Sequence, residues 1–232
     1  QVNDEEEVYL IDSILIEDPG EHVSFLFSDS VIKILHSCKE DLEAIYSWTG
    51  KEMTNIFDTQ VANSFLDGDF TIGYQGLVKQ ELGINLNKNE TRSNWIRRPL
   101  SDSQLKYAAL DVEYLIHLYK LQKEELSKTS KLDWLDQDIK RLSELTFNRR
   151  SHFVELERNI SKAQEAEILY KFNKVIDEIS DHEKINKTLF FSKKAQKDFL
   201  RLVLLKGLDL ACSEITLWRS QLIKEEILNL LK

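Results

Sequence analysis

Residues 31–40, Val-Ile-Lys-Ile-Leu-His-Ser-Cys-Lys-Glu, join a strand signal directly to a helix signal. The first six residues are mostly apolar and rich in β-branched side chains, which is typical of a short buried strand. Residues 37–40 then have the S-x-x-E form of a helix capping box, and the apolar positions that follow at near-helical spacing end at Gly50. A strand that leads straight into a helix is the repeating unit of α/β proteins.

The same alternation continues on both sides of this stretch. Residues 8–12 and 55–59 are further strand candidates, and shorter helices are expected over 60–66 and 75–82. A second capping box, S-x-x-Q, begins at Ser101, and apolar residues recur after it at helical spacing. This pattern predicts one helix from Asp102 to about Leu126. We therefore expect an α/β layer architecture for the front of the chain.

The rear of the chain has a different pattern. After the polar linker at 127–131, one or two helices are expected over 132–174, and 187–232 contains no proline and a single glycine. Six of the seven glycines fall before residue 84, so turns concentrate in front and helices behind. We expect an α/β domain over 1–126 and a small all-α region over 127–232.

Composition excludes several classes of protein. With 42% hydrophobic and 31% charged residues the chain is globular, and no apolar run approaches the ~20 residues of a transmembrane helix. Cys38 and Cys212 are too few for a disulfide framework and lack zinc-site spacing, so a cytoplasmic location is expected. The net charge of −9 makes the chain a poor phosphate binder unless metal ions or local basic patches reverse the field.

Two aspartates are candidates for chemistry. Asp111 and Tyr107 are four residues apart and share one face of a predicted helix, where Asp111 interrupts an apolar stripe. Such a carboxylate must be paired, hydrogen-bonded or bound to metal, and for a lone aspartate ordinary pairing at a helix edge is the commoner case. Asp41 follows the strand predicted at 31–36, at the end where open α/β sheets bind ligands. An acid in the first turn of a helix also suits the helix dipole, so both interpretations stay open.

Other polar residues have simpler interpretations. We expect Asp58 to cap a helix, Glu40 to be the capping-box partner and His36 to be a hydrogen-bonded structural residue. Two basic clusters either contact nucleic acid or form solvated surfaces. The clusters are Lys88, Arg92, Trp95, Arg97 and Arg98 in one loop, and Lys193, Lys194, Lys197 and Arg201 on one helical face.

Five motifs in fixed order resemble the bacterial ribonuclease D family, within the DEDD superfamily of 3′-to-5′ exonucleases. The resemblance extends from about Tyr9 to Trp134, and 187–232 is similar more weakly to the helical HRDC domains of that family. The motifs are His36-Ser37-Cys38-Lys39-Glu40-Asp41-Leu42-Glu43, Phe57-Asp58-Thr59-Gln60, Leu82-Gly83-Ile84-Asn85-Leu86-Asn87-Lys88, Trp95-Ile96-Arg97-Arg98-Pro99-Leu100 and Gln104-Leu105-Lys106-Tyr107-Ala108-Ala109-Leu110-Asp111-Val112.

The resemblance implies a ribonuclease-H-like exonuclease core that hydrolyses phosphodiester bonds at RNA 3′ ends. Two divalent metal ions, Mg²⁺ or Mn²⁺, would act per site in the complete protein. Asp41 and Asp111 would match two of the metal-binding aspartates, and Tyr107 would match the tyrosine of the DEDDy subclass, which orients the attacking water. The implied substrates are tRNA precursors, and we expect a monomer that binds RNA and no membrane.

The chain departs from the family at its start. The first motif of the family, an Asp-x-Glu on the first strand, has no match, since residues 4–7 are a charged run and Asp12 lies on the wrong strand. The first residue is Gln1 rather than Met, so we expect an exonuclease that lacks its amino-terminal strands and is inactive as this chain alone. The alternatives are a non-catalytic RNA-binding relic of the same fold, a DNA-proofreading exonuclease, and a protein-interaction scaffold with no metal dependence.

Overall fold

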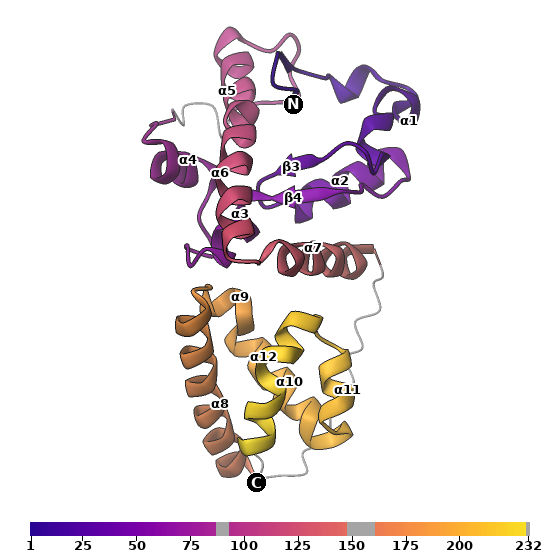
Figure 1. The fold of residues 1–232 in the computed structure, drawn as a ribbon. Coiled ribbons are helices and arrows are strands. Elements are labelled where there is room, and N and C mark those ends of the chain that lie inside the picture. The colour runs from indigo at the N-terminus through magenta and orange to yellow at the C-terminus, as the bar shows by residue number, and fades with distance from the viewer. Residues whose placement is uncertain (87–92, 148–160, 231–232) are drawn as a thin grey trace. The chain divides into compact units, whose positions relative to one another are not determined.

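The strand predicted at 31–36 and the helix after it are both present in the computed structural model, which describes residues 1–86, 93–147 and 161–230. The strand is β3, Lys33–Leu35, and it pairs in parallel with the fully buried β4, Ile56–Asp58. Parallel strands need a crossover connection, and α2, Lys39–Thr49, supplies it (Figure 1). Gly50, with φ of 71°, ends α2 in the left-handed conformation that glycine adopts without strain.

The start of α2 differs from the prediction, because Asp58 rather than Ser37 caps it. Ser37 has φ of 62°, and the N-cap Cys38 makes no side-chain capping bond. The Asp58 carboxylate accepts the N–H groups of Ser37 at 3.0 Å and Cys38 at 2.7 Å, and that of Gln60 at 2.8 Å, where α3, Thr59–Phe65, begins. One buried carboxylate thus satisfies donors at two helix starts. The predicted S-x-x-E capping box is wrong, and the prediction that Asp58 caps a helix is confirmed.

The long helix predicted from Asp102 is two helices. Tyr114 lies at the junction with φ of −104° and ψ of 0°, and its N–H donates to the Tyr74 hydroxyl at 3.0 Å. A side chain inserted into the helical hydrogen-bond ladder is a known cause of a break. Periodicity could not reveal the break because the acceptor comes from 40 residues earlier. The two helices are α5, Asp102–Glu113, and α6, Leu115–Lys128.

The remaining elements around this sheet are short. The strand predicted at 8–12 is reduced to two residues that pair antiparallel with a strand at the start of the chain. The capping box at Ser101 and Gln104 is confirmed, with the Gln104 N–H donating to the Ser101 hydroxyl at 3.2 Å. The elements are β1 Val2–Asn3, β2 Val8–Tyr9, η1 Ser13–Leu15, α1 Pro19–His22, η2 Ser24–Phe27 and α4 Tyr74–Leu82.

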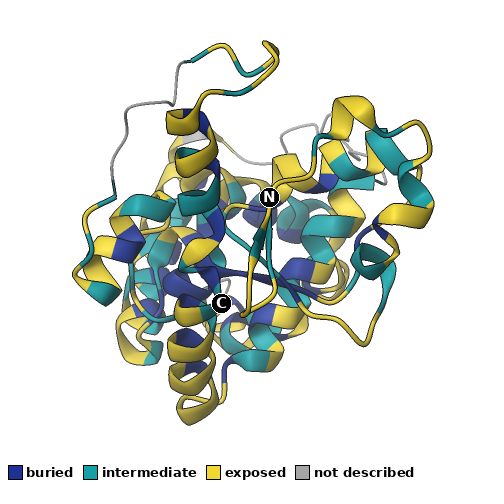
Figure 2. Ribbon diagram, turned by 90° about the horizontal axis from the view of Figure 1, so that it is seen from above, coloured by how far each residue is buried: buried dark blue, intermediate teal, exposed yellow. Residues whose placement is uncertain are grey.

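The rear of the chain is helical at all of its described elements, as predicted. Its core is aromatic: Trp218, Phe172 and Phe190 are almost completely buried, and the Trp134 ring stacks on Trp218 at 4.9 Å between centroids. Figure 2 marks the buried positions in dark blue. The helices are α7 Leu132–Phe147, α8 Lys162–Glu183, α9 Lys187–Phe191, α10 Lys193–Lys206, α11 Leu208–Ser213 and α12 Leu217–Leu230.

The chain forms two compact units, Gln1–Ala62 with Thr71–Lys128, and Asn63–Phe70 with Thr129–Lys232. A single boundary after residue 126 was expected, but the structure groups residues 63–70 with the second unit. Lys131 explains the association, because its buried ammonium donates to the Phe65 carbonyl at 3.1 Å and to the carbonyls of Glu183 and Lys184 at the end of α8. A cation suits the negative end of a helix.

Candidate active site

The two candidate aspartates line one cavity in the first unit. This cavity has a volume of about 770 Å³, and Asp41 of α2 and Asp111 of α5 both contribute to its wall. His36, at the end of β3, and Tyr74, at the start of α4, line it as well. Two carboxylates that the sequence places 70 residues apart therefore face the same space.

Burial makes both carboxylates poor places for an uncompensated negative charge. The Asp41 side chain keeps contact with solvent through the open cavity, but the surrounding protein raises the pKa of its carboxyl, and the charges of Asp58 and Glu40 raise it further. Burial also raises the pKa of the half-buried Asp111. No described residue forms a hydrogen bond or ion pair with either carboxylate, although the charge of the Gln1 amino group, which lines the same cavity, lowers the pKa of both in part. A bound cation would favour the ionised form of both groups.

The donor atoms of the two aspartates are of the type that hard divalent cations prefer. Carboxylate oxygens suit Mg²⁺ and Mn²⁺, and Mg²⁺ commonly uses only one or two protein carboxylates with waters and substrate phosphates completing its shell. Within residues 1–86, 93–147 and 161–230, no three His, Cys, Asp or Glu side chains lie close enough together to hold an ion. The described residues therefore fit an open, carboxylate-poor site and not a closed protein cage.

Tyr107 lies one turn before Asp111 on α5, as its spacing predicts. Its ring contacts Trp95, with 5.9 Å between ring centroids, so one aromatic of the first basic cluster lies beside it. Arg97 is exposed. The Arg98 guanidinium is engaged by Asp12, with Nη2 to Oδ1 at 2.7 Å, and would have to leave that pair to contact a phosphate. Lys88 and Arg92 lie outside the described residues.

The second basic cluster, like the first, contains both exposed side chains and one that is held in an ion pair. Lys193, Lys194 and Lys197 are exposed on α10. Arg201 is directed to the buried Glu165 of α8, with Nε to Oε1 at 2.7 Å, and this pair joins the two helices. Three lysines therefore lie on the exposed face, where Lys194 is 3.9 Å from the Asp198 carboxylate, and the arginine contributes to packing.

His36 is a hydrogen-bonded structural residue, as predicted. Its Nε2 lies 3.0 Å from the Ile72 carbonyl and its Nδ1 lies 2.9 Å from the Thr59 hydroxyl. A carbonyl only accepts, so Nε2 carries a hydrogen. Burial lowers the pKa of His36, which favours the neutral ring.

Tyr74 lines the cavity but is not among the residues predicted from the sequence. Burial raises the pKa of its hydroxyl, and the charge of Asp111 contributes to the rise. Tyr74 thus lies near Asp111 in space although 37 residues separate them. No pattern in the sequence marks this residue, because its partners come from α5 and β3.

Comparison with known proteins finds similar sequences and structures. Residues 1–127 match the family model described as 3′-5′ exonuclease. Ribonuclease D of Pseudomonas paraeruginosa is 42% identical over 138 residues, which are 60% of this chain and 36% of that protein. Ribonuclease D of Haemophilus influenzae is 43% identical over 129 residues, 56% of this chain and 32% of that protein. The matched segment spans about a third of the length of these relatives.

Solved structures show the same fold. Escherichia coli RNase D matches 98% of this chain and 62% of its own with a TM-score of 0.60 at 22% identity. Brucella melitensis NrnC matches 61% of this chain and 69% of its own with a TM-score of 0.51 at 23% identity. Among the described helices, none has the length and apolar character needed to cross a membrane. On the match over 1–127, the chain belongs to the 3′-5′ exonuclease family.

Proposed function

We propose that this protein is a divalent-metal-dependent 3′-to-5′ exoribonuclease of the ribonuclease D type. The observation that supports it is the shared cavity: Asp41 and Asp111 come from separate motifs and line one space, and Tyr107 lies one turn from Asp111. The relatives named as ribonucleases support RNA as the substrate. We propose 3′ ends of RNA, with tRNA precursors as the substrate class.

Each residue has one task in this proposal. The carboxylates of Asp41 and Asp111 hold divalent ions, two per site. Such ions supply an activated water and charge stabilisation at the reacting phosphate. The Tyr107 hydroxyl orients the attacking water, and Trp95, whose ring contacts Tyr107, stacks on a terminal base. Arg97 is available for a phosphate contact.

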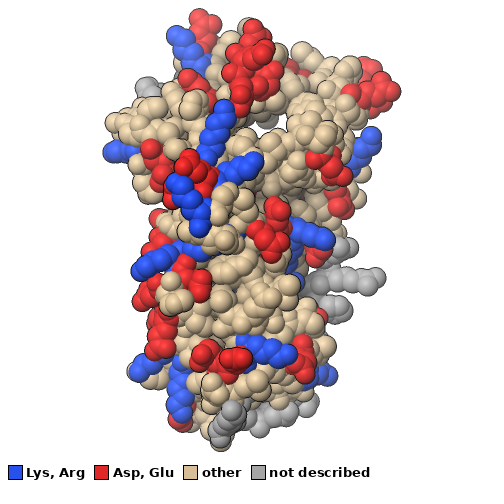
Figure 3. All heavy atoms as spheres, viewed as in Figure 1, with Lys and Arg blue, Asp and Glu red and all other residues tan. Residues whose placement is uncertain are grey.

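The second unit would contribute affinity for the body of the RNA. Lys193, Lys194 and Lys197 share one exposed helical face on α10. Over the face drawn in Figure 3, Lys and Arg are interspersed with Asp and Glu, so a uniform basic surface does not attract the RNA there. We place the protein in the cytoplasm, a reducing compartment that suits the buried free thiols of Cys38 and Cys212, and we propose that it acts as a monomer.

The alternative is a non-catalytic RNA-binding protein of the same fold. The observation that favours it is that the described residues bring together no group of three potential metal ligands. It predicts RNA binding that is equal with Mn²⁺ and with a chelator.

The experiment that separates the two follows 5′-labelled RNA in Mg²⁺ or Mn²⁺, with the protein expressed from its whole natural reading frame. The proposal predicts shortening from the 3′ end that a chelator stops and that Asp41→Asn or Asp111→Asn reduces by about a hundredfold or more. Asp209→Asn, an exposed aspartate in the second unit paired with Lys224, is the matched control and should trim at the wild-type rate. Trimming that survives in both active-site variants would contradict the assignment, and RNA binding without any trimming would support the alternative.

A further inference from the structure

The geometry points to Tyr74 and Asn3 as positioning residues that act through the last turn of α5 and fix the carboxylate of Asp111 in the cavity. This inference rests on the proposed function, because it assigns a purpose to the placement of Asp111. Neither residue belongs to the motifs that suggested the site, and both come from segments far from α5 in the sequence.

Tyr74 holds the residue at which α5 ends. The Tyr114 N–H donates to the Tyr74 hydroxyl at 3.0 Å, and the same N–H closes the helix on the Val112 carbonyl. In a continuous helix this N–H would donate to Leu110, one turn earlier. The Tyr114 carbonyl then accepts from Leu118 at 3.0 Å and starts α6. The hydroxyl therefore lies at the point where the helix axis is interrupted, three residues after Asp111.

Asn3 holds the other backbone groups of this turn. Its side-chain amide donates to the Val112 carbonyl at 3.3 Å and to the Glu113 carbonyl at 3.2 Å, across 109 and 110 residues of sequence. These carbonyls are among the last four of α5, which have no partner within the helix. Consequently, each of the three residues that follow Asp111 has a backbone group bonded by a side chain from a distant segment.

Tyr74 is itself held rigidly. Its ring lies edge to face with the His36 ring, at 5.8 Å between centroids and 63° between planes. Both of its neighbours on α4, Leu77 and Val78, are completely buried, and Tyr74 and Tyr114 pack against the same cluster. The hydroxyl thus acts from a fixed point, as support for a metal-binding side chain requires.

Loss of the hydroxyl has a specific consequence for Asp111. Without it, the Tyr114 N–H in this half-buried turn has the Leu110 carbonyl as the nearest helical acceptor, and α5 and α6 can close into one helix. Closing the break reorients the turn that carries Asp111. Displacement of a reacting or ligating group by about 1 Å lowers the rate of an enzyme by as much as a hundredfold, so a small rotation matters.

The test measures Mn²⁺ affinity and stability side by side. Apparent Mn²⁺ affinity is taken from water-proton relaxation during titration of the 232-residue chain, and the melting temperature from circular dichroism. Tyr74→Phe should weaken Mn²⁺ binding about tenfold. Exchange of the Tyr114 amide hydrogen should change at the same time. The second variant, Asn3→Ala, should also weaken Mn²⁺ binding.

Two controls separate positioning from stability. Tyr119→Phe makes the same substitution on α6, where the hydroxyl accepts only from Lys123 in the described structure, and should leave affinity unchanged. Leu126→Val removes buried volume from α6 far from the junction and should lower the melting temperature without changing affinity. Mn²⁺ affinity equal to wild type in both Tyr74→Phe and Asn3→Ala would overturn this inference but not the proposed function. A wild-type chain whose Mn²⁺ binding is absent, or is unchanged by Asp111→Asn, would overturn the proposed function first.

Discussion

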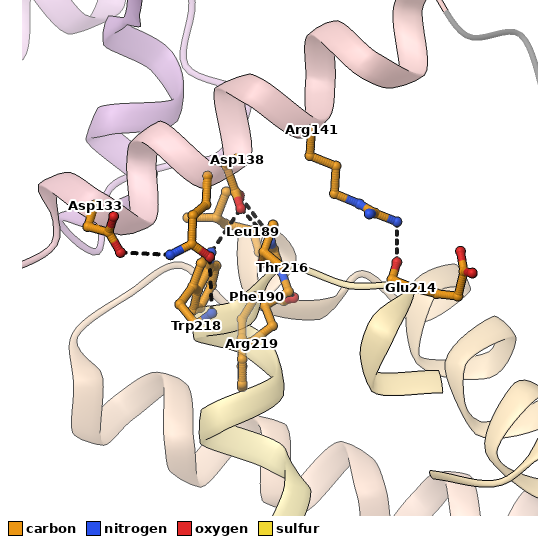
Figure 4. Close-up of polar contacts among 10 residues, drawn as sticks. Asp133, Asp138, Arg141, Leu189, Phe190, Glu214, Thr216, Trp218 and Arg219 are labelled. Carbon is orange, nitrogen blue, oxygen red and sulfur yellow. Dashed lines mark hydrogen bonds and ion pairs between the residues drawn. The ribbon is translucent and has the colours of Figure 1, made fainter. Parts of the chain in front are cut away.

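The two units of the chain use aspartates in opposite ways. In the second unit, the Asp138 carboxylate accepts from Arg219 Nη2 at 2.8 Å and from the Trp218 ring nitrogen at 2.9 Å, and both charged side chains are almost buried (Figure 4). In the first unit, Asp41 and Asp111 face a cavity, and none of the described residues bonds to either carboxylate. Removal of a fully bonded acid leaves its buried partner unpaired, whereas an unbonded acid with a raised pKa is available for a cation.

The largest effect is expected at the bonded acid. Asp138→Ala leaves the Arg219 guanidinium buried without its carboxylate, although that group also donates to the Leu189 and Phe190 carbonyls (Figure 4). Removing one partner of a buried ion pair typically costs about 3–5 kcal/mol, so urea denaturation should show a loss of this order. A loss below about 1 kcal/mol would mean that the pair does not hold α7 to α12.

The cavity acids should respond in the opposite direction. Burial raises the pKa values of Asp41 and Asp111 by more than the charge of the Gln1 amino group lowers them, so their charged forms destabilise the folded chain at pH 7, and neutral asparagine removes that penalty. Asp111→Asn and Asp41→Asn should therefore unfold at the same urea concentration as wild type or at a higher one. Clear destabilisation by either variant would mean that the carboxylate has a structural partner.

A smaller effect is expected at Tyr107. Its hydroxyl orients water in the proposal and holds no metal, so Tyr107→Phe should lower trimming about tenfold or more while Mn²⁺ affinity stays at the wild-type value. The ring contact with Trp95 remains in phenylalanine, which preserves packing. The prediction is checked by single-turnover trimming together with a Mn²⁺ titration of the same sample. Loss of Mn²⁺ affinity in this variant would place Tyr107 among the ligands instead.

The smallest effect is expected on the exposed face of α10. Lys193→Ala combined with Lys197→Ala should weaken RNA binding several-fold at low salt, reduce the salt dependence of the affinity by about two phosphate contacts, and leave melting unchanged. Lys206→Ala, at the end of the same helix, is the matched control. If the double variant binds RNA as tightly as Lys206→Ala does, this face of α10 is only a solvated surface.

The sequence predicted the main helices and strands better than the caps and breaks that end them. The β3–α2 unit and the α5 capping box depend on local signals within a few residues, and the structure has both. The cap of α2 and the break at Tyr114 were predicted wrongly, because Asp58 and Tyr74 act on backbone groups 20 and 40 residues away. A local motif cannot show that a distant side chain competes for the same donor.

The measurement that tests the central claim most directly is a double-mutant cycle on Mn²⁺ binding. The 232-residue chain, Asp41→Asn, Asp111→Asn and the double variant are titrated under one set of conditions. If both carboxylates serve one site, in which the binding of each ion depends on the other, either single change should remove most of the binding, and the double variant should be little worse than the singles. Independent losses that add in the double variant, or single variants that bind Mn²⁺ as wild type does, would contradict a shared site.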